Sequence, residues 1–265
     1  MVKDLGLYYH RILFLLLLLL MFLEARAVIV RRSSDRGGAN HGWLNTKHTF
    51  SFANYYDTKF NSYGKLRVIN EDHVIPGKGF PTHPHRDFEI FSYVIKGGIR
   101  HKDSMGNVEI CLPGDIQFTS AGKGIFHSEF SEPQHGPLHF LQIWISPNET
   151  GLTPSYQTKH FSDEDKLGKL CLCVSGTGEN NSIQINQDVK FYASKLNIGD
   201  SVSYELKKGR KGYLHNIETS SNLKIISSEE DYELLPGDGA FLNSGSYTFE
   251  STKDLAHFVF FDLKE

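Results

Sequence analysis

The chain of 265 residues carries 28 basic and 31 acidic side chains, a net charge of −3, and 39% of its residues are hydrophobic. This is the composition of a globular protein, and it argues against a disordered chain. It also argues against direct binding of nucleic acid, because no basic excess is present to neutralise a phosphate backbone.

The N-terminus has the layout of a secretory leader. An apolar run from Ile12 to Leu23 is followed by the small residues Ala25 and Ala27. We predict a signal-peptide-like leader at residues 1–27, and cleavage after Ala27 would make the protein secreted or periplasmic. The run covers about 18 Å, short of the roughly 30 Å of a bilayer core, so no stable membrane anchor is expected. Translation from Met21 is the open alternative and would give a cytoplasmic protein.

After the leader, short apolar or alternating runs rich in β-branched and aromatic residues recur between glycine, proline and asparagine. Such runs predict an all-β chain. They occur at residues 64–69, 89–95, 114–118 and 139–145. Pro147 to Asp165 is polar and lacks strand periodicity, which favours a connection between domains. We therefore divide the chain into a first domain at 28–150, a linker at 151–167 and a second domain at 168–265.

A turn motif occurs once in each half of the chain. Leu-Pro-Gly-Asp followed by an apolar run begins at Leu112 and again at Leu235. This recurrence predicts two copies of one β-barrel, a fold that leaves no strand edge exposed.

Two pairs of metal-ligating residue types have the spacing of a strand. His83 and His85 are two residues apart, as are His127 and Glu129, so each pair shares one face of its strand. Three imidazoles and one carboxylate suit a divalent ion of Fe, Mn, Co, Ni, Cu or Zn. Glu89 has the same odd numbering and is open as an alternative ligand or as a residue that orients an imidazole.

The remaining histidines and the cysteines give weaker signals. We interpret His101 as a surface or edge residue, and we expect no second metal centre around His215 and His257, which have no H-x-H partner. Three cysteines are too few for a disulfide framework. We interpret them as small buried apolar side chains, with a soft metal site at Cys171 and Cys173 as the alternative.

Several strings of residues resemble the pirin family. They are His48 to Tyr56 (HTFSFANYY), Thr82 to Arg86 (THPHR), His101 to Asn107 (HKDSMGN) and Ser120 to Glu129 (SAGKGIFHSE). Gly77, the His83/His85 pair and Glu89 also resemble the first cupin motif. The resemblance extends from about residue 30 to the C-terminus.

The resemblance implies a bicupin, a chain of two jelly-roll-like cupin barrels of which the second has no metal site. It implies metal ligands at His83, His85, His127 and Glu129, with Glu89 outside that set, and Fe(II) as the favoured ion. Members of the family include quercetin 2,3-dioxygenases and nuclear or redox-linked regulators.

Our leading hypothesis is a metal-dependent dioxygenase that cleaves a flavonol with O2, with Glu129 or Glu89 as the base that deprotonates the 3-hydroxyl. Phe50, Phe52 and Phe126 are candidates for lining the pocket. The alternative is a metal- or redox-sensing regulator that binds a protein partner without turnover. A different cupin activity is a third hypothesis, because a fold alone does not identify a reaction. We expect a monomer.

Overall fold

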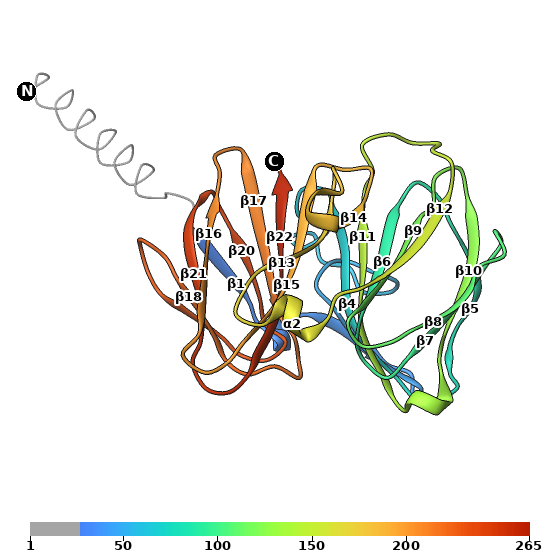
Figure 1. Ribbon diagram of the computed structural model, residues 1–265, viewed down its shortest axis with the longest axis horizontal. Coiled ribbons are helices and arrows are strands. Elements are labelled where there is room, and N and C mark those ends of the chain that lie inside the picture. Colours follow the sequence, from blue (N-terminus) through green and yellow to red (C-terminus); the bar gives the residue numbers. More distant parts are fainter. Residues whose placement is uncertain (1–26) are drawn as a thin grey trace, which may run out of the picture.

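The computed structural model describes residues 27–265, and almost every regular element in this range is a β-strand (Figure 1). Apart from Ala27, the leader predicted at residues 1–27 lies outside the described residues. Within residues 27–265 no helix is long and apolar enough to cross a membrane. The only α-helix in this range is the single turn α2 (Asp163–Lys166), and three short 3-10 turns occur at Ser33–Asp35, Pro133–His135 and Glu179–Asn181.

The first barrel is built from a seven-stranded and a four-stranded antiparallel sheet. The larger sheet has the order β12-β9-β6-β11-β4-β3-β2 and the smaller one β5-β10-β7-β8. The strands of the larger sheet are β2 (Gly37–Asn40), β3 (Leu44–His48), β4 (Leu66–Val74), β6 (Glu89–Lys96), β9 (Asp115–Ser120), β11 (Leu138–Ile145) and β12 (Ser155–His160). Those of the smaller sheet are β5 (Gly79–His85), β7 (Ile99–Asp103), β8 (Val108–Cys111) and β10 (Ile125–Ser131).

The second barrel repeats this plan, apart from one parallel strand pair at the edge of its larger sheet. Its larger sheet has the order β1-β20-β17-β22-β15-β13-β14 and its smaller sheet the order β16-β21-β18-β19. The larger sheet holds β1 (Val28–Arg31), β13 (Cys171–Ser175), β14 (Ile183–Gln184), β15 (Val189–Leu196), β17 (Arg210–Asn216), β20 (Gly239–Leu242) and β22 (Ala256–Lys264). The smaller sheet holds β16 (Ser201–Leu206), β18 (Leu223–Ile226), β19 (Tyr232–Leu234) and β21 (Gly245–Ser251). The prediction of an all-β chain with two cupin barrels is confirmed.

The repeated turn motif has the same local structure in both barrels. The Asp115 side chain accepts a hydrogen bond from the Leu112 amide at 2.7 Å, and the Asp238 side chain accepts one from the Leu235 amide at 3.0 Å. The glycine between them has a φ of +91° at Gly114 and +81° at Gly237, a conformation that side chains disfavour. In both barrels the turn leads into a strand of the larger sheet, β9 or β20.

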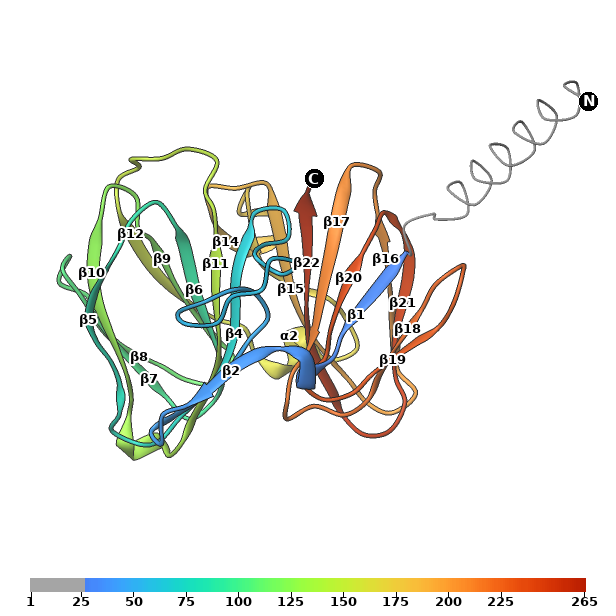
Figure 2. The same ribbon diagram turned by 180° about the vertical axis from the view of Figure 1, so that it is seen from behind.

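Two strands cross the domain boundaries expected from the sequence. β1 opens the predicted first domain at 28–150, yet it pairs with β20 of the second barrel (Figure 2). The predicted linker at 151–167 contains β12, which pairs with β9 at the edge of the first barrel. β12 was missed because an edge strand with one exposed face has a polar sequence without a buried alternation.

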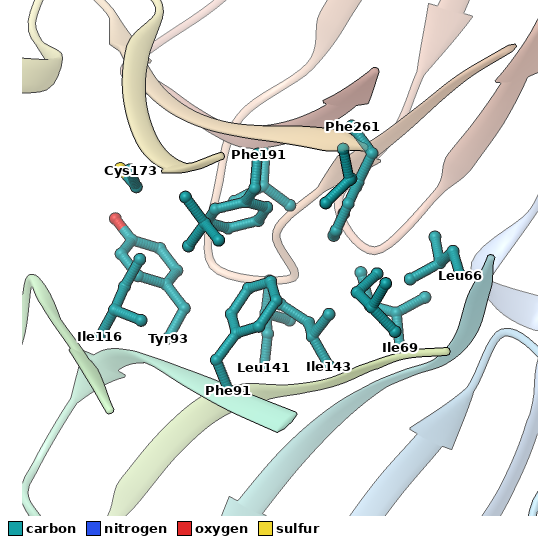
Figure 3. Packing of buried hydrophobic residues seen from close by; sticks show 14 of the residues in the cluster. Leu66, Ile69, Phe91, Tyr93, Ile116, Leu141, Ile143, Cys173, Phe191 and Phe261 are labelled. Atoms are coloured by element: carbon teal, nitrogen blue, oxygen red, sulfur yellow. The ribbon is translucent and has the colours of Figure 1, made fainter. Parts of the chain in front are cut away.

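The two larger sheets pack face to face and share one apolar core. Phe91 and Leu141 from the first barrel pack against Phe191 and Phe261 from the second (Figure 3), and all four are at most 1% exposed. The ring centroids of Phe91 and Phe191 are 5.1 Å apart. Side chains of β6 and β11 therefore alternate between this shared core and the interior of the first barrel.

A carboxylate is buried in the contact between the barrels. Glu71 on β4 is fully buried, and its Oε1 accepts hydrogen bonds from His139 Nε2 at 2.9 Å and from the Glu218 amide at 2.7 Å. Its Oε2 lies 2.8 Å from His215 Nε2 and 3.4 Å from Arg36 Nη1. His215 and Glu218 belong to the second barrel, so this carboxylate ties the two barrels together.

Candidate metal centre

Neighbouring strands of the smaller sheet carry the four predicted ligands. His83 and His85 lie on β5, and His127 and Glu129 lie on β10, with His127 directly opposite His83. The pairing then shifts, since Glu129 stands opposite Phe80, so β5 has one extra residue at this point. The bulge re-aims side chains around the barrel interior, as bulges beside functional sites commonly do.

The three imidazoles meet at one point. The Nε2 atoms of His83 and His127 are 3.0 Å apart. The ring centroids of His83, His85 and His127 are separated by 4.5 to 4.8 Å. One nitrogen from each ring lies within 4.8 Å of the others. His127 is buried and His83 is half-exposed, so the cluster lies at the edge of the barrel interior.

Glu129 is held firmly beside this cluster. Its Oε2 accepts a hydrogen bond from Gln142 Nε2 at 2.8 Å, and its Oε1 accepts from Ser92 Oγ at 3.1 Å and Gln117 Nε2 at 3.3 Å. Glu129 forms a second possible ligand group with His127 and His101, in which one ligand atom of each residue lies within 4.8 Å of the others. His127 belongs to both this group and the three-imidazole group. The carboxylate is therefore adjacent to His127, and its orientation is fixed by neighbouring polar side chains.

His101 differs from our interpretation of it as a surface or edge residue. Its side chain is fully buried, with Nε2 3.0 Å from Asp103 Oδ2, and its ring stacks on Tyr156 of β12 at 4.4 Å. The spacing of His101 and Asp103 was visible in the sequence as another alternating pair. Tyr156 was missed because it falls in the predicted linker.

The environment favours neutral imidazoles and an ionised carboxylate. Burial, together with His127 and His83, lowers the pKa of His85 to about 3. Burial also lowers the pKa of His127, against the opposing effect of Glu129. For Glu129, burial works to raise the pKa, but the surrounding histidines, His127 first, hold it below its ordinary value. A neutral imidazole and a carboxylate are the forms that bind metals.

Glu89 lies outside this cluster. It sits on β6, where Phe91 and Tyr93 on the same face belong to the core shared by the barrels. Its Oε1 accepts from Ser120 Oγ at 2.6 Å, and its Oε2 accepts from the backbone and side chain of Asn186 at 2.9 and 3.1 Å. These contacts contradict our suggestion that Glu89 faces the histidines. The suggestion was wrong because odd numbering places two residues on a common face only when they lie on the same strand.

A cavity of about 300 Å³ lies in the first barrel and is separated from His85 by the rings of Phe52 and Trp144. Its polar lining includes His48, Asn70 and Asp72, and its aromatic lining includes Phe52 and Phe80. Phe52 packs edge-on against Trp144, which in turn packs edge-on against His85 at a centroid distance of 4.7 Å. The three polar residues are at most 5% exposed, and His48 Nδ1, Asn70 Oδ1 and Asp72 Oδ1 have no hydrogen-bond partner.

Of the aromatic residues predicted to line a pocket, only Phe52 lines this cavity. Phe50 packs in the core shared by the barrels, and Phe126 is 55% exposed. Asn70 and Asp72 were missed by the sequence analysis, although their spacing on one strand placed them on the same face. The predicted lone histidines of the second half lie at the barrel contact, with His215 beside Glu71 and His257 Nε2 2.9 Å from the Tyr93 hydroxyl.

Known families account for both barrels. The profile of the pirin family matches residues 29–145, and that of the quercetinase C-terminal cupin domain matches residues 172–263. The chain belongs to the pirin family. The family assignment agrees with the resemblance seen in the sequence motifs.

Curated pirin relatives cover most of the chain. A protein of Escherichia coli K12 named quercetin 2,3-dioxygenase is 41% identical over 205 residues, which is 76% of this chain and 87% of that protein. A pirin-like protein of Caulobacter vibrioides is 43% identical over 190 residues, 71% of this chain and 81% of its own length.

Solved pirin structures share the fold over nearly the whole described range. YhhW from Escherichia coli superposes with a TM-score of 0.82 at 36% identity, covering 89% of this chain and 97% of that chain. A structure of the same bacterial pirin in complex with nickel(II) gives a TM-score of 0.81 at 35% identity, covering 89% of this chain and 99% of its own.

Proposed function

We propose that this pirin is a metal-dependent dioxygenase that cleaves a flavonol with O2, and that His83, His85, His127 and Glu129 hold one divalent metal ion, Fe(II) in the first instance. The observation that carries the proposal is the convergence of the three imidazoles in a barrel that also contains a partly aromatic cavity. The names of the curated relatives supply the reaction class.

The donor set fits a divalent transition metal. The Nε2 atoms of His83 and His127 are 3.0 Å apart, so both can direct a lone pair at a common ion. Burial lowers the pKa of His85 and of His127, which favours the neutral, metal-binding form of these two rings. Three imidazoles with a carboxylate suit Fe, Mn, Co, Ni, Cu and Zn alike. Gln142, Gln117 and Ser92 would orient the Glu129 carboxylate, a role that commonly strengthens metal binding. The bound ion would supply a Lewis acid for the hydroxyl and carbonyl oxygens of the substrate.

The cavity supports a polyhydroxylated aromatic ligand. Asn70 Oδ1 and Asp72 Oδ1 are buried without partners, so they would accept hydrogen bonds from ligand hydroxyls. Trp43, Phe52 and Phe80 form an apolar wall suited to a planar ring. A ligand with several phenolic groups would satisfy both parts of the lining.

Asp72 is better suited than Glu129 to accept a proton from the substrate. Burial raises the pKa of Asp72 to about 7, near the pH at which a general base works best. Glu129 has a lowered pKa and accepts three hydrogen bonds, which supports a role as metal ligand more than as base. We assign the proton transfer to Asp72 within the proposed reaction.

The test uses the full chain purified without added metal. Bound metals are measured by mass spectrometry, and oxygen uptake is followed with a panel of flavonols. We expect His85→Ala to lose bound metal and oxygen uptake together, while His135→Ala, at an exposed position, retains both. Oxygen uptake by metal-free protein would overturn the metal-dependent mechanism. Normal metal binding without uptake on any flavonol would overturn the dioxygenase proposal and favour a metal-sensing regulator.

A further inference from the structure

Two cysteine thiols lie in contact on β13 of the second barrel. Cys173 Sγ is 3.9 Å from Cys171 Sγ, within the distance of a sulfur hydrogen bond. Neither sulfur takes part in the proposed metal centre, which belongs to the first barrel. Cys111, the remaining cysteine of the chain, lies on β8 in a different hydrophobic cluster.

We propose that Cys171 and Cys173 are a redox-active pair that closes to an intramolecular disulfide when the protein meets a hydroperoxide, and reopens with a thiol reductant.

The backbone allows the two sulfurs to bond. In a regular strand, residues two apart have Cα atoms roughly 6.6 Å apart, at the upper end of the range seen for disulfides, about 4.4 to 6.8 Å. β13 is not regular here, because Leu172 pairs with Tyr192 and Val174 with Phe191, which leaves Cys173 as an extra residue. A bulge bends its strand, and here the two sulfurs already lie 3.9 Å apart. The sulfurs then need only to turn toward each other.

Access to the pair is through Cys171. Cys171 is half-exposed and lines a surface cavity of about 350 Å³ together with Lys159, His160 and Tyr192. This volume admits a small hydroperoxide. Cys173 is fully buried at one end of the core shared by the barrels, close to Tyr93 (Figure 3). An oxidant therefore meets Cys171 first.

The two thiols differ in a way that suits attack followed by ring closure. The hydrogen bond from Cys173 lowers the pKa of Cys171, and Lys166 and Lys169 add to this effect against the opposing effect of burial. Burial and the contact with Cys171 raise the pKa of Cys173 well above its ordinary value. A thiolate is the nucleophilic form of cysteine, so Cys171 is the attacking group and Cys173 the resolving group.

The reaction balances with one hydroperoxide per pair. The Cys171 thiolate attacks one oxygen of H2O2, an S–O bond forms and the O–O bond breaks, and hydroxide leaves and takes up a proton to become water. The Cys173 sulfur then attacks the sulfenic acid sulfur of Cys171. The S–S bond forms, the S–O bond breaks, and the hydroxyl leaves as water with the proton of Cys173. Two thiols are oxidised by one electron each and the peroxide is reduced by two.

The closed form would reopen readily. The loop that it closes contains only three residues, so the bond restricts the unfolded chain far less than a long-range disulfide does. A bond between residues so close in a strand carries strain, and strained or accessible disulfides are the ones that cellular thiols reduce. The pair is therefore suited to repeated oxidation and reduction rather than to structural cross-linking.

The experiment treats the reduced full-length chain with equimolar H2O2 and counts alkylatable thiols by mass spectrometry. Trypsin cleaves after Lys169 and Lys190 and leaves both cysteines of the pair in one peptide, separate from the peptide of Cys111. We expect accessible thiols in the denatured protein to fall from three to one. The peptide that contains Cys171 and Cys173 should be lighter by the mass of two hydrogen atoms, and dithiothreitol should restore its original mass.

Matched variants separate the roles of the two sulfurs. Cys111→Ser should leave the reaction unchanged. Cys173→Ala should stop it at a sulfenic acid on Cys171, detectable with a cyclic 1,3-dione, and Cys171→Ser should remove reactivity from this peptide. Oxidation of Cys171 to sulfinic acid with Cys173 still free, or disulfides that link two chains, would overturn the proposal. The thiol count and peptide mass of the unaltered chain test the proposal by themselves, so the test does not depend on whether a variant folds.

Discussion

Replacing Glu71 by glutamine should weaken the contact between the two barrels more than a change of one atom suggests. In the Glu71→Gln variant, the Oε1 side can still accept from His139 and from the Glu218 amide. The Oε2 side becomes an amide NH2 that faces the former donors His215 and Arg36. The variant therefore loses two hydrogen bonds to a charged group and leaves the buried Arg36 guanidinium without its carboxylate.

The expected magnitude follows from these two losses. A hydrogen bond to a charged group contributes about 1.5 to 3 kcal/mol, and breaking a buried ion pair costs about 3 to 5 kcal/mol. We expect the free energy of unfolding at pH 7 to fall by about 4 kcal/mol. Urea-induced unfolding, followed by tryptophan fluorescence and circular dichroism, measures this loss. Glu205→Gln is the matched control on an exposed strand position and should change stability by less than about 0.5 kcal/mol.

The pH dependence provides a second check on Glu71. Although burial opposes ionisation, His215, His139 and Arg36 hold the pKa of Glu71 well below its ordinary value of 4.5. The folded protein therefore binds this proton less tightly than the unfolded chain, and the stabilisation is present above pH 4.5 and lost as the pH falls below it. The difference in the free energy of unfolding between the unaltered chain and Glu71→Gln should therefore narrow as the pH falls below 4.5. A loss below about 1 kcal/mol at pH 7 would refute the reasoning.

Three further changes probe the first barrel. Burial raises the pKa of Asp72 from 3.8 to about 7, so the free energy of unfolding should fall as the pH rises through this window. In chelator-treated protein, Asp72→Asn should remove that dependence and raise the free energy of unfolding at pH 8 by about 4 kcal/mol. An unchanged pH profile of stability in the variant would contradict this. Gly79→Ala would place a Cβ against the Glu129 carbonyl oxygen and push β5 away from β10, so thermal unfolding should show a loss of about 1 to 3 kcal/mol; an unaltered melting curve would exclude this clash. Glu129→Gln should weaken metal binding at least about tenfold in a calorimetric titration, whereas unchanged affinity with lost turnover would make Glu129 a base.

The sequence predicted the parts of the structure that depend on local patterns. The alternation of side chains along a strand is a local property, so His83 with His85, and His127 with Glu129, were placed on common faces correctly. The Leu-Pro-Gly-Asp turn is also local, since its hydrogen bond joins residues three apart, and its recurrence predicted the second barrel.

The sequence did not reveal what depends on register between distant strands. Whether Glu89 points into the barrel or toward the second barrel is decided by the pairing of β6 with β9 and β11, which no pattern within β6 specifies. The burial of His101 likewise depends on Tyr156 of β12, a strand too polar to be recognised. The raised pKa of Asp72 arises first from its burial as the barrel closes around it, and then from the nearby Glu129 carboxylate.

The pairing of β1 with the second barrel affects how the chain folds while it is being synthesised at the ribosome. β1 (Val28–Arg31) leaves the exit tunnel before its partner β20 (Gly239–Leu242), because the two strands lie far apart in the sequence. At roughly 5 to 20 residues per second, synthesis of the intervening chain takes on the order of 10 to 40 s. During this delay the first barrel can already close, whereas β1 remains an unpaired apolar segment. Nascent chains should therefore bind a holdase chaperone through β1 until β20 has emerged.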